Sequence, residues 1–468
     1  MAKQSERARH PRIFDATPRS GEVIETRYRR ITTPLPHPAT TAVLECLNRY
    51  EPMSMGGQPP IVWDRAEGIN VYDEAGNRWL DFSSGVLVAN CGHSAPEVKA
   101  ALIDQIERGV LFSYCFPNRP RADLAKRLVE LAGGRIDRCF LLTTGAETVE
   151  NALKLARTYG LKQGGRSKRV IVSFKGAFHG RTLGAQLAGG IPALKDWIGI
   201  ENTGFITIPF PDHSAVPADF SVFKRVLDAL KVVSDQVCGV IAESYQGGTA
   251  RFYPDAYIKD LRTWCDQHDA LLIADEVQSG FGRTGKLFAY QHYDIEPDII
   301  CCGKGLSGSL PISAVLGNSR FMDLYGPGEM TSTHSGNPLC ARAALASLDI
   351  IEQQKLVANA REMGLLLHAQ LTQLQQRFPD LISSVNGRGL VAAVLFVNSQ
   401  GQPDGQLAMK VVDYCVRHGV MVYAPLGPGG ATVKLNPPLI ITAEPLLEGL
   451  SVFSESVAWC KEAGSRRN

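Results

Sequence analysis

Short apolar segments alternate with helical patterns along most of this 468-residue chain, and this alternation constrains the fold more than any other feature. Patterns with helical spacing separate several of the apolar segments. Apolar strands that are bounded by helices predict an α/β fold, in which helices cover both faces of a mainly parallel sheet. We expect this large domain to span residues 90–340. The strand-like segments are residues 139–142, 170–174, 205–209, 237–242, 271–274, 299–302 and 312–316.

The two ends of the chain carry a different pattern. Residues 68–82 predict a β-hairpin, because two alternating strands flank a turn. Near the C-terminus, long helical patterns and short strands lead to a last helix over residues 445–461. We expect a smaller α+β domain that combines residues 36–89 with residues 341–468. Residues 1–35 are rich in arginine, and we expect them to form a flexible, solvated tail and not a nucleic-acid-binding arm.

Composition and charge exclude several classes of protein. The formal net charge is only +2, so the chain lacks the positive field that nucleic-acid binding needs. No apolar run approaches the ~18 residues of a membrane span, and the N-terminus lacks the apolar segment of a secretory signal. The 11 cysteines show no metal-ligand spacing, so we expect no metal and reduced thiols. These features predict a cytoplasmic protein without nucleic-acid or membrane partners.

A glycine-rich loop at residues 280–285 resembles two nucleotide-binding motifs. It matches G-x-G-x-x-G, but no helix opens there and no acidic residue ends the next strand, as a dinucleotide site requires. The loop also nearly matches a P-loop, but Leu287 stands where a hydroxyl must bind magnesium. We therefore expect no nucleotide site in this loop.

Lys304 and Asp275 form the strongest chemical signal in the sequence. Asp275 ends one apolar strand, and Lys304 lies 29 residues further on, directly after the next strand and between two glycines. Open α/β sheets bind ligands at the carboxyl ends of such strands. Pyridoxal 5'-phosphate (PLP) chemistry uses this pair, because the lysine forms a Schiff base with the cofactor and the carboxylate keeps the pyridine nitrogen protonated. Taken singly, a strand-capping acid and a solvated surface lysine are the alternatives.

A phosphate site is predicted where a strand leads into the helix at residues 146–159. The chain passes through Gly145 and Ala146 into this helix, whose free N–H groups and dipole attract an anion. The alternative is an ordinary helix start that Thr144 and Glu147 cap.

Together these motifs resemble the class III (omega) aminotransferases, which are PLP-dependent transferases of fold type I. The resemblance covers about residues 60–442 and is densest over residues 271–285 and 297–305. It implies an aminotransferase that moves an amino group from an amine or amino acid to a keto acid through a Lys304 Schiff base. The alternative is an amino-acid racemase or epimerase on the same scaffold, in which Lys304 returns the proton to the opposite face. A decarboxylase, an aminomutase and a non-catalytic dimeric binding protein are the remaining alternatives.

The resemblance also implies which residues bind the cofactor. Lys304 would carry PLP, and Asp275 would pair with the pyridine nitrogen. Val277 and Phe178 would pack on opposite faces of the ring, although Phe178 could instead be an ordinary core aromatic. Thr333 would reach the phosphate of the neighbouring subunit, which implies a homodimer with shared active sites. The other implied contacts are Gly145 and Ala146 at the phosphate, Gln278 near the ring hydroxyl, His179 and Glu243.

The residues that would bind substrate depart from the family pattern. Arg181 matches a position that grips a substrate carboxylate in several members, although it could instead form an internal salt bridge. Lys434 replaces a second arginine and lacks its bidentate guanidinium, while Gly248 replaces a gating acid and Ser244 replaces a proline. We therefore expect inefficient use of 2-oxoglutarate and glutamate. The rest of the substrate mouth is expected to be aromatic and fairly apolar, and to include Val86, Tyr114 and Tyr245.

Overall fold

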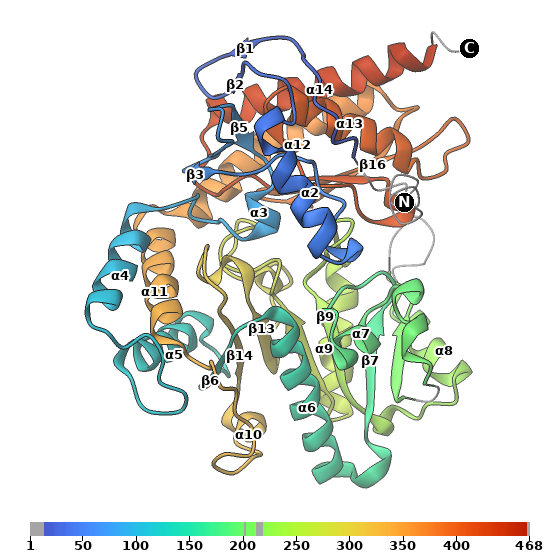
Figure 1. The fold of residues 1–468 in the computed structure, drawn as a ribbon. Helices are drawn as coiled ribbons and strands as arrows, with labels where there is room; N and C mark the ends of the chain where they lie inside the picture. Colours follow the sequence, from blue (N-terminus) through green and yellow to red (C-terminus); the bar gives the residue numbers. More distant parts are fainter. Residues whose placement is uncertain (1–13, 201–202, 212–218, 466–468) are drawn as a thin grey trace. The chain divides into compact units, whose positions relative to one another are not determined.

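The computed structural model of this protein describes residues 14–200, 203–211 and 219–465. The chain divides into two compact units by its internal contacts. The first unit combines Met1–Ala95 with Asn359–Asn468, and the second unit is Pro96–Ala358. The first unit therefore contains both the blue and the red ends of the ribbon in Figure 1.

The second unit is built around a seven-stranded sheet with the strand order β6-β14-β13-β12-β9-β7-β8. Strands β8, β7, β9, β12 and β13 pair in parallel, whereas β14 runs antiparallel to both β13 and β6. The predicted mainly parallel sheet is confirmed. Its strands are β6 (Arg138–Leu142), β7 (Val170–Phe174), β8 (Phe205–Ile208), β9 (Val237–Glu243), β12 (Leu271–Asp275), β13 (Ile299–Cys302) and β14 (Ser313–Gly317).

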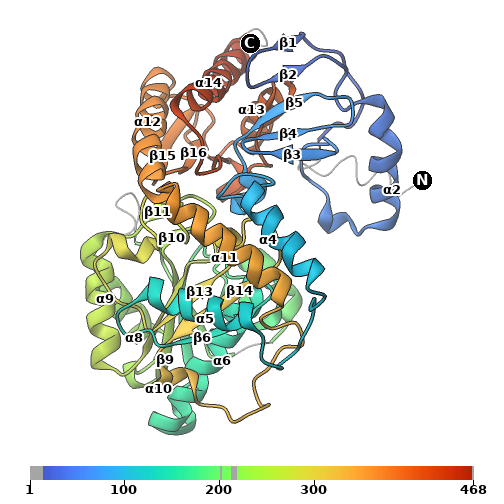
Figure 2. The same cartoon turned by 90° about the vertical axis from the view of Figure 1, so that its left-hand side faces the viewer.

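Helices cover both faces of this sheet (Figure 1). Consecutive residues of a strand point to opposite faces. In β12, Ile273 therefore enters the core beneath α6, while Leu272 enters the core beneath α8 and α9. A separate group, α11 with α4 and α5, packs together as Figure 2 shows. The helices of this unit are α4 (Pro96–Glu107), α5 (Arg119–Ala132), α6 (Gly145–Gly164), α7 (Leu183–Ala188), α8 (Ser221–Ala229), α9 (Asp255–Gln267), α10 (Ser319–Met322) and α11 (Pro338–Gln353).

The first unit is an α+β assembly that draws on both ends of the chain, as predicted. Its larger sheet joins β17 from the C-terminal part to β5 from the N-terminal part, in parallel. The strands of this sheet are β1 (Ile24–Glu25), β2 (Arg30–Ile31), β3 (Arg65–Glu67), β4 (Asn70–Tyr72), β5 (Arg78–Asp81) and β17 (Val420–Met421). A second sheet contains β15 (Ile382–Arg388), β16 (Val391–Phe396) and β18 (Thr432–Leu435). The helices are α2 (Thr41–Tyr50), α12 (Leu356–Arg377), α13 (Gly405–Arg417) and α14 (Ala443–Ser465), and the segment labelled α3 (Ser84–Leu87) is a turn with positive φ values.

The unit boundaries differ from those expected at residues 35, 90 and 340. Residues 1–13 of the predicted flexible tail lie outside the described residues, but β1 and β2 belong to the larger sheet of the first unit. Beside them, Nε of Arg29 lies 2.7 Å from Oε1 of Glu448 in α14. The expected boundary at residue 340 falls inside α11, which packs on α4 and α5 and so belongs to the second unit. These differences arise from long-range packing, which local sequence patterns do not contain.

Three features of the described residues bear on the classes of function considered above. All 11 cysteines are free thiols. None of the helices in the described ranges combines the length and the apolar character that crossing a bilayer requires. The described side chains also include no group of three or more His, Cys, Asp or Glu arranged to hold a metal ion.

Candidate active site

Three neighbouring parallel strands of the second unit bring the predicted chemical residues to one edge of the sheet. Asp275, the last residue of β12, pairs in register with Glu243, the last residue of β9. On its other side Asp275 pairs with Cys301 of β13, and Lys304 follows β13 after a single glycine. The sheet register therefore places Glu243, Asp275 and Lys304 at adjacent strand ends, the edge at which open α/β sheets bind ligands.

Asp275 is held by two hydrogen bonds. Its Oδ2 lies 2.7 Å from Nδ1 of His179, and its Oδ1 accepts a 3.1 Å bond from the backbone N–H of Val277. Because a carboxylate can only accept, Nδ1 of His179 carries the proton. Asp275 is 5% exposed and His179 is 3% exposed. The imidazole therefore fixes the orientation of the carboxylate, and Nε2 of His179 is left buried without a hydrogen-bond partner.

Glu243 connects its strand to two neighbouring segments. Its Oε2 accepts a 3.1 Å bond from the N–H of Phe178, and its Oε1 accepts a 3.0 Å bond from the N–H of Gly247. Burial raises the pKa of Glu243 to about 7, and the nearby charge of Asp275 adds to this rise, while His179 opposes it. Glu243 thus supports the backbone of Phe178 and shares the electrostatic environment of Asp275.

Lys304 is a half-buried side chain on a constrained backbone. Its φ of +39° lies in the left-handed region, which a residue with a side chain adopts only when its surroundings enforce it. Burial lowers the pKa of the Lys304 ammonium, while the charges of Asp275 and Glu243 oppose part of this shift. A lowered pKa increases the fraction of neutral amine, which is the nucleophilic form.

The start of α6 lies next to Val277 and to the glycine that precedes Lys304. A methyl group built on Gly145 would come within 2.6 Å of Cγ1 of Val277, and one built on Gly303 would come within 3.2 Å of the same atom. One built on Gly180 would come within 2.9 Å of Cβ of Ala146. The N-terminus of α6 and the turn that carries Lys304 therefore both lie next to Val277, the residue expected on one face of the ring.

Thr144 and Glu147 cap α6 as the alternative interpretation of this motif proposes. The Thr144 side chain accepts the N–H of Glu147, and Oε2 of Glu147 accepts the N–H of Thr144 at 2.9 Å. These capping bonds use the amides of Thr144 and Glu147, not those of Gly145 and Ala146. The cap is therefore compatible with an anion bound at the amides of Gly145 and Ala146.

Tyr245 occupies a different position from the one expected. The sequence predicts it in the substrate mouth, but it is 1% exposed. Its hydroxyl donates to Oε1 of Gln278 at 3.2 Å and lies 3.4 Å from the backbone oxygen of the same residue. Tyr245 is thus a buried contact of a predicted cofactor residue.

Glu276 was not among the predicted site residues, although it directly follows Asp275. It is fully buried, and its carboxylate accepts hydrogen bonds from the hydroxyls of Ser244 and Ser279 and from the amides of Ala289 and Tyr290. The sequence does contain a signal for Glu276, namely a second acid directly after a buried strand. Such an acid needs hydrogen-bond partners when it is buried, so its position indicates a structural role.

The predicted substrate residues of the second unit lie on its surface. Arg181 is exposed, and its guanidinium carbon lies 5.5 Å from the ring centre of Phe178, which is itself half-buried. Tyr114 is 39% exposed, and its hydroxyl lies 3.2 Å from Oγ1 of Thr331, two residues before the exposed Thr333. The sheet edge and these surface residues therefore belong to the same unit.

Val86 and Lys434 belong to the first unit. Val86 is 41% exposed and has a φ of +66°, in a turn whose residues Ser84 to Leu87 all have positive φ. Lys434 is buried in β18, with 1% exposure. The hydroxyl of Ser84 donates to the backbone oxygen of Asn436 at 2.6 Å and so ties the turn of Val86 to the segment that follows Lys434.

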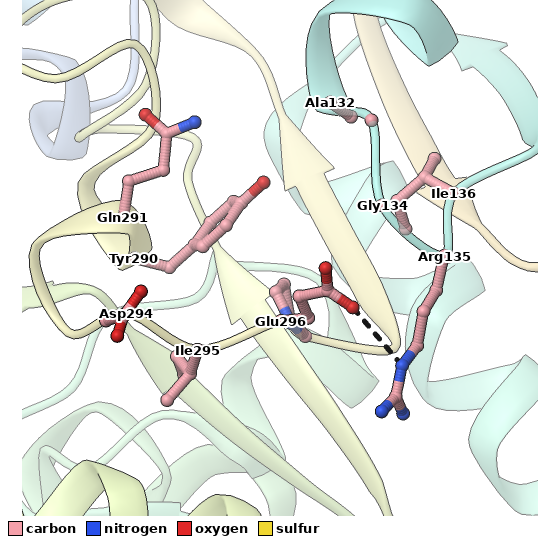
Figure 3. Close-up of a pocket in the computed structure, with 11 residues that line it drawn as sticks. Ala132, Gly134, Arg135, Ile136, Tyr290, Gln291, Asp294, Ile295 and Glu296 are labelled. Atoms are coloured by element: carbon pink, nitrogen blue, oxygen red, sulfur yellow. Dashed lines mark ion pairs between the residues drawn. The ribbon is translucent and has the colours of Figure 1, made fainter.

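A separate pocket of about 390 Å³ opens in the second unit between the end of α5 and residues 290–297 (Figure 3). Arg135 and Glu296 form an ion pair across it, with 3.2 Å between Nε and Oε2. None of the predicted cofactor or substrate residues lines this pocket.

The sequence and the fold both match known proteins. Residues 53–457 match the family described as Aminotransferase class-III. The acetylornithine aminotransferase of Agrobacterium fabrum is 34% identical over 401 residues, which cover 85% of this chain and 94% of that enzyme. A transaminase from the marine bacterium Virgibacillus has the same fold with a TM-score of 0.82 and 25% identity, over 90% of this chain and 99% of that one.

A third match names the cofactor. The ornithine aminotransferase of Toxoplasma gondii, described with PLP at its active site, superposes with a TM-score of 0.80 and 29% identity, over 90% of this chain and 95% of that chain. The names of these relatives are those of transaminases, and they lend no support to the racemase alternative. The prediction of fold type I is confirmed. The chain belongs to the class III aminotransferases, enzymes that use PLP.

Proposed function

We propose that this aminotransferase binds PLP covalently through Nζ of Lys304, and that Asp275 pairs with the pyridine nitrogen. The main support is that Asp275 ends β12 and Lys304 lies two residues after the end of the neighbouring parallel strand β13, so that the charge of Asp275 acts on the Lys304 amine. Beside this pair, Nε2 of His179 is a buried polar atom that has no hydrogen-bond partner within the protein alone. A lysine with a lowered pKa, a fixed carboxylate and a helix N-terminus together fit an aldehyde, a pyridine ring and a phosphate.

Each group of the chain has a separate task in this proposal. PLP, when bound, draws electrons away from the substrate carbon that carries the amino group. Asp275, oriented by His179, holds a proton at the pyridine nitrogen. Once the substrate amine has replaced it on the cofactor, the freed Nζ of Lys304 would take the proton from the substrate carbon and pass it to the cofactor during amino transfer. Val277 and Phe178 pack against the two faces of the ring, and this contact excludes water from it.

The phosphate is proposed to bind at Gly145 and Ala146. Both residues lie in the first turn of α6, where the helix dipole and the backbone N–H groups attract an anion. Gln278 is proposed to contact the ring hydroxyl, and Glu243 to hold the Phe178 segment in place.

Reduction and peptide mapping test the attachment site. Borohydride treatment of the yellow holoenzyme is expected to bleach its visible absorption and to leave a stable cofactor adduct on the peptide that contains Lys304. An adduct on any other lysine would refute this proposal.

For the substrates, we propose an amino acid or amine as donor, with its carboxylate, where present, bound by Arg181. Lys434 and Gly248 stand where many family members have an arginine and an acid, so we propose that 2-oxoglutarate is a poor acceptor. The relatives are named for acetylornithine and ornithine, which makes these two compounds the first donors to assay. Equal kcat/KM values for pyruvate and 2-oxoglutarate with the best donor would contradict the acceptor proposal.

We also propose a homodimer with shared active sites, in which Thr333 reaches the phosphate bound by the neighbouring subunit. The loop around Thr333 lies against an exposed apolar segment: Asn337 donates to the backbone oxygen of Leu111 at 2.8 Å, and the His334 ring contacts Phe112. Exposed apolar clusters of this kind are typical of subunit interfaces. The exposed apolar side chains of this segment are Ile103, Ile106, Val110, Leu111, Phe112 and Phe116.

Light scattering of two matched variants tests the dimer. Phe116 is 75% exposed and Leu365, in α12, is 73% exposed. Phe116→Asp is expected to shift the protein towards monomers and to weaken PLP retention, whereas Leu365→Asp is expected to leave the dimer intact. A monomeric wild-type enzyme with full activity would disprove the shared site.

A cytoplasmic location is part of the same proposal. The 11 free cysteines support it, because unpaired thiols persist where the surroundings are reducing. Fractionation of the cells that make this protein would test the location.

A further inference from the structure

Two hydroxyl groups directly after β9 cross to the segment that follows β12. Ser244 donates its hydroxyl to Oε1 of Glu276. Tyr245 donates its hydroxyl to Oε1 of Gln278, at 3.2 Å. We call these four residues the hydroxyl clip. All the atoms that make it are brought together by the register that pairs Glu243 with Asp275, because that register places the next residues of both strands side by side.

The Ser244 side of the hydroxyl clip is entirely buried. Ser244 is 5% exposed and Glu276 is fully buried, so their bond is shielded from water. Burial raises the pKa of Glu276, and the hydrogen bond from Ser244 is the largest contribution that opposes this rise. A hydrogen bond to a buried carboxylate is stronger than one between neutral groups. Ser244 therefore stabilises the ionised form of Glu276.

Glu276 extends this contact to the loop beyond the strand. Its Oε1 also accepts the N–H of Tyr290 at 2.8 Å, and its Oε2 accepts the hydroxyl of Ser279 at 2.7 Å and the N–H of Ala289 at 2.9 Å. The Glu276 carboxylate thus binds the side chain of Ser279 and the backbone of Ala289 and Tyr290. Ser244 connects the same carboxylate to the end of β9.

On the other side of the hydroxyl clip, Tyr245 orients the side-chain amide of Gln278. Because Oε1 of Gln278 accepts the tyrosine hydroxyl, the side-chain amide is oriented with its oxygen towards Tyr245 and its NH₂ group away from it. The ring of Tyr245 is itself held against Phe252, with 5.4 Å between ring centres. Tyr245 therefore determines which group Gln278 offers to its other neighbours.

We propose that Ser244 and Tyr245 are positioning residues of the cofactor site: the hydroxyl clip holds Asp275, Val277 and Gln278 in the arrangement that PLP requires. This inference rests on the function proposed above. A proline at position 244, as in the family pattern, has no hydroxyl and cannot make the bond to Glu276. The hydroxyl clip thus depends on a residue in which this chain departs from the family pattern. Its Ser244 contact lies at Glu276, directly after Asp275, and its Tyr245 contact lies at the amide of Gln278.

Four holoenzyme variants test the hydroxyl clip. Ser244→Ala and Tyr245→Phe each remove one hydroxyl, and Ser244→Thr keeps it. Tyr159→Phe is the matched control, since Tyr159 is also 1% exposed and donates its hydroxyl to the carboxylate of Asp269. Asp269 precedes β12, at the opposite end of the strands of the second unit from the proposed site. The readouts are the pH midpoint of the visible absorption of bound PLP and the separate values of kcat and donor KM.

Loss of either hydroxyl is expected to shift the pH midpoint by about half a unit or more and to lower kcat about threefold to tenfold, with donor KM within about twofold of wild type. Ser244→Thr and Tyr159→Phe are expected to match the wild type in both readouts. A change in the spectral midpoint distinguishes positioning from a general loss of stability, which would lower the amount of folded enzyme without moving the midpoint.

Two outcomes would overturn the proposal. Wild-type midpoints and kcat values in both Ser244→Ala and Tyr245→Phe would show that the hydroxyl clip positions nothing. An equal shift in Tyr159→Phe would show that the effect does not belong to the site. In either case an intact adduct on Lys304 would leave the proposed function standing, whereas an adduct elsewhere would refute that function independently of the hydroxyl clip.

Discussion

The strand-end edge of the second unit and the surface residues expected to bind substrate are held in very different ways. At the edge, Glu243 and Asp275 are each 5% exposed, and each accepts two hydrogen bonds from neighbouring segments. Arg181 and Thr333 are exposed side chains on loops. The part of the reaction that all family members share needs fixed geometry, whereas recognition of a particular substrate can rest on residues that change at little structural cost. Substitutions at the strand-end edge should therefore cost more activity than substitutions at the exposed residues.

Replacement of Lys304 should have the largest effect. Lys304→Ala removes the proposed attachment point and proton carrier, so we expect kcat to fall at least about a thousandfold and the visible absorption of bound PLP to change. Lys286→Ala, at an exposed lysine of the same unit, is the control and should behave as wild type. Turnover of Lys304→Ala at the wild-type rate would contradict the proposed role of Lys304.

Asp275→Asn should have the next largest effect. It keeps the shape of the side chain but removes the negative charge that binds His179 and that we propose to pair with the pyridine nitrogen. Removing one preorganised electrostatic contact typically lowers kcat about a hundredfold to a thousandfold, so we expect kcat to fall about a hundredfold or more. Asp269→Asn, which changes a carboxylate that binds Tyr159 before β12 begins, should leave kcat nearly unchanged. Steady-state kinetics of the two variants decides the matter.

The pKa of Glu243 predicts a pH dependence of stability. The folded-state pKa of about 7 lies above the ordinary value of 4.5, so the folded protein retains a proton that the unfolded chain has lost between these values. The free energy of unfolding should therefore decrease as pH rises from about 4.5 to 7, by roughly 3 kcal/mol from this group.

Thermal unfolding across this pH range checks the prediction. Glu243→Gln stays neutral at every pH, so its stability should decline less steeply than that of the wild type. Glu107→Gln, at an exposed acid of α4, is the control and should follow the wild type. Parallel curves for wild type and Glu243→Gln would mean that Glu243 remains ionised in the folded protein.

Arg181→Ala should have the smallest effect. Loss of an exposed guanidinium that binds a carboxylate should raise KM for amino-acid donors about tenfold, with the absorption of bound PLP unchanged. Donors without a carboxylate should be unaffected, and Arg166→Ala, at another exposed arginine, should match the wild type for all donors. If KM for amino acids does not change, Arg181 has only its contact with the Phe178 ring.

The sequence predicted the sheet and the strand-end residues because both depend on local patterns. Apolar runs identify the strands, and Asp275 and Lys304 come to the same edge because Asp275 ends β12 and Lys304 follows the end of its parallel neighbour β13. The direction of β14 was not predictable, because an antiparallel strand inside a parallel sheet is as apolar as its neighbours. The burial of Tyr245 and the partners of Glu276 depend on the pairing of β9 with β12, which is a contact between segments far apart in sequence.

The boundary near residue 340 could not be predicted for the same reason. Helix α11 has an ordinary helical pattern, and only its packing against α4 and α5 assigns it to the second unit. The predicted flexible tail was judged by its charge, although Arg27 and Arg29 pair with Glu444 and Glu448 of α14. Charge alone does not distinguish a solvated segment from one that a distant helix binds.

The antiparallel direction of β14 has a consequence for how the chain can be altered. Because β14 starts at the edge where β13 ends, only residues 303–312 connect the two strands, and Lys304 lies in this connection. The end of this connection is also held in place, since the hydroxyl of Ser313, the first residue of β14, donates to the backbone oxygen of Thr144 at 2.9 Å, just before α6. The parallel strands instead return through long connections that contain helices, and such connections accept added length at a low entropic cost. Insertions, new termini and fused domains therefore belong in the exposed parts of those long connections, away from the strand ends that carry the proposed site, and the span from β13 to β14 should be kept at its present length in any engineered descendant of this enzyme.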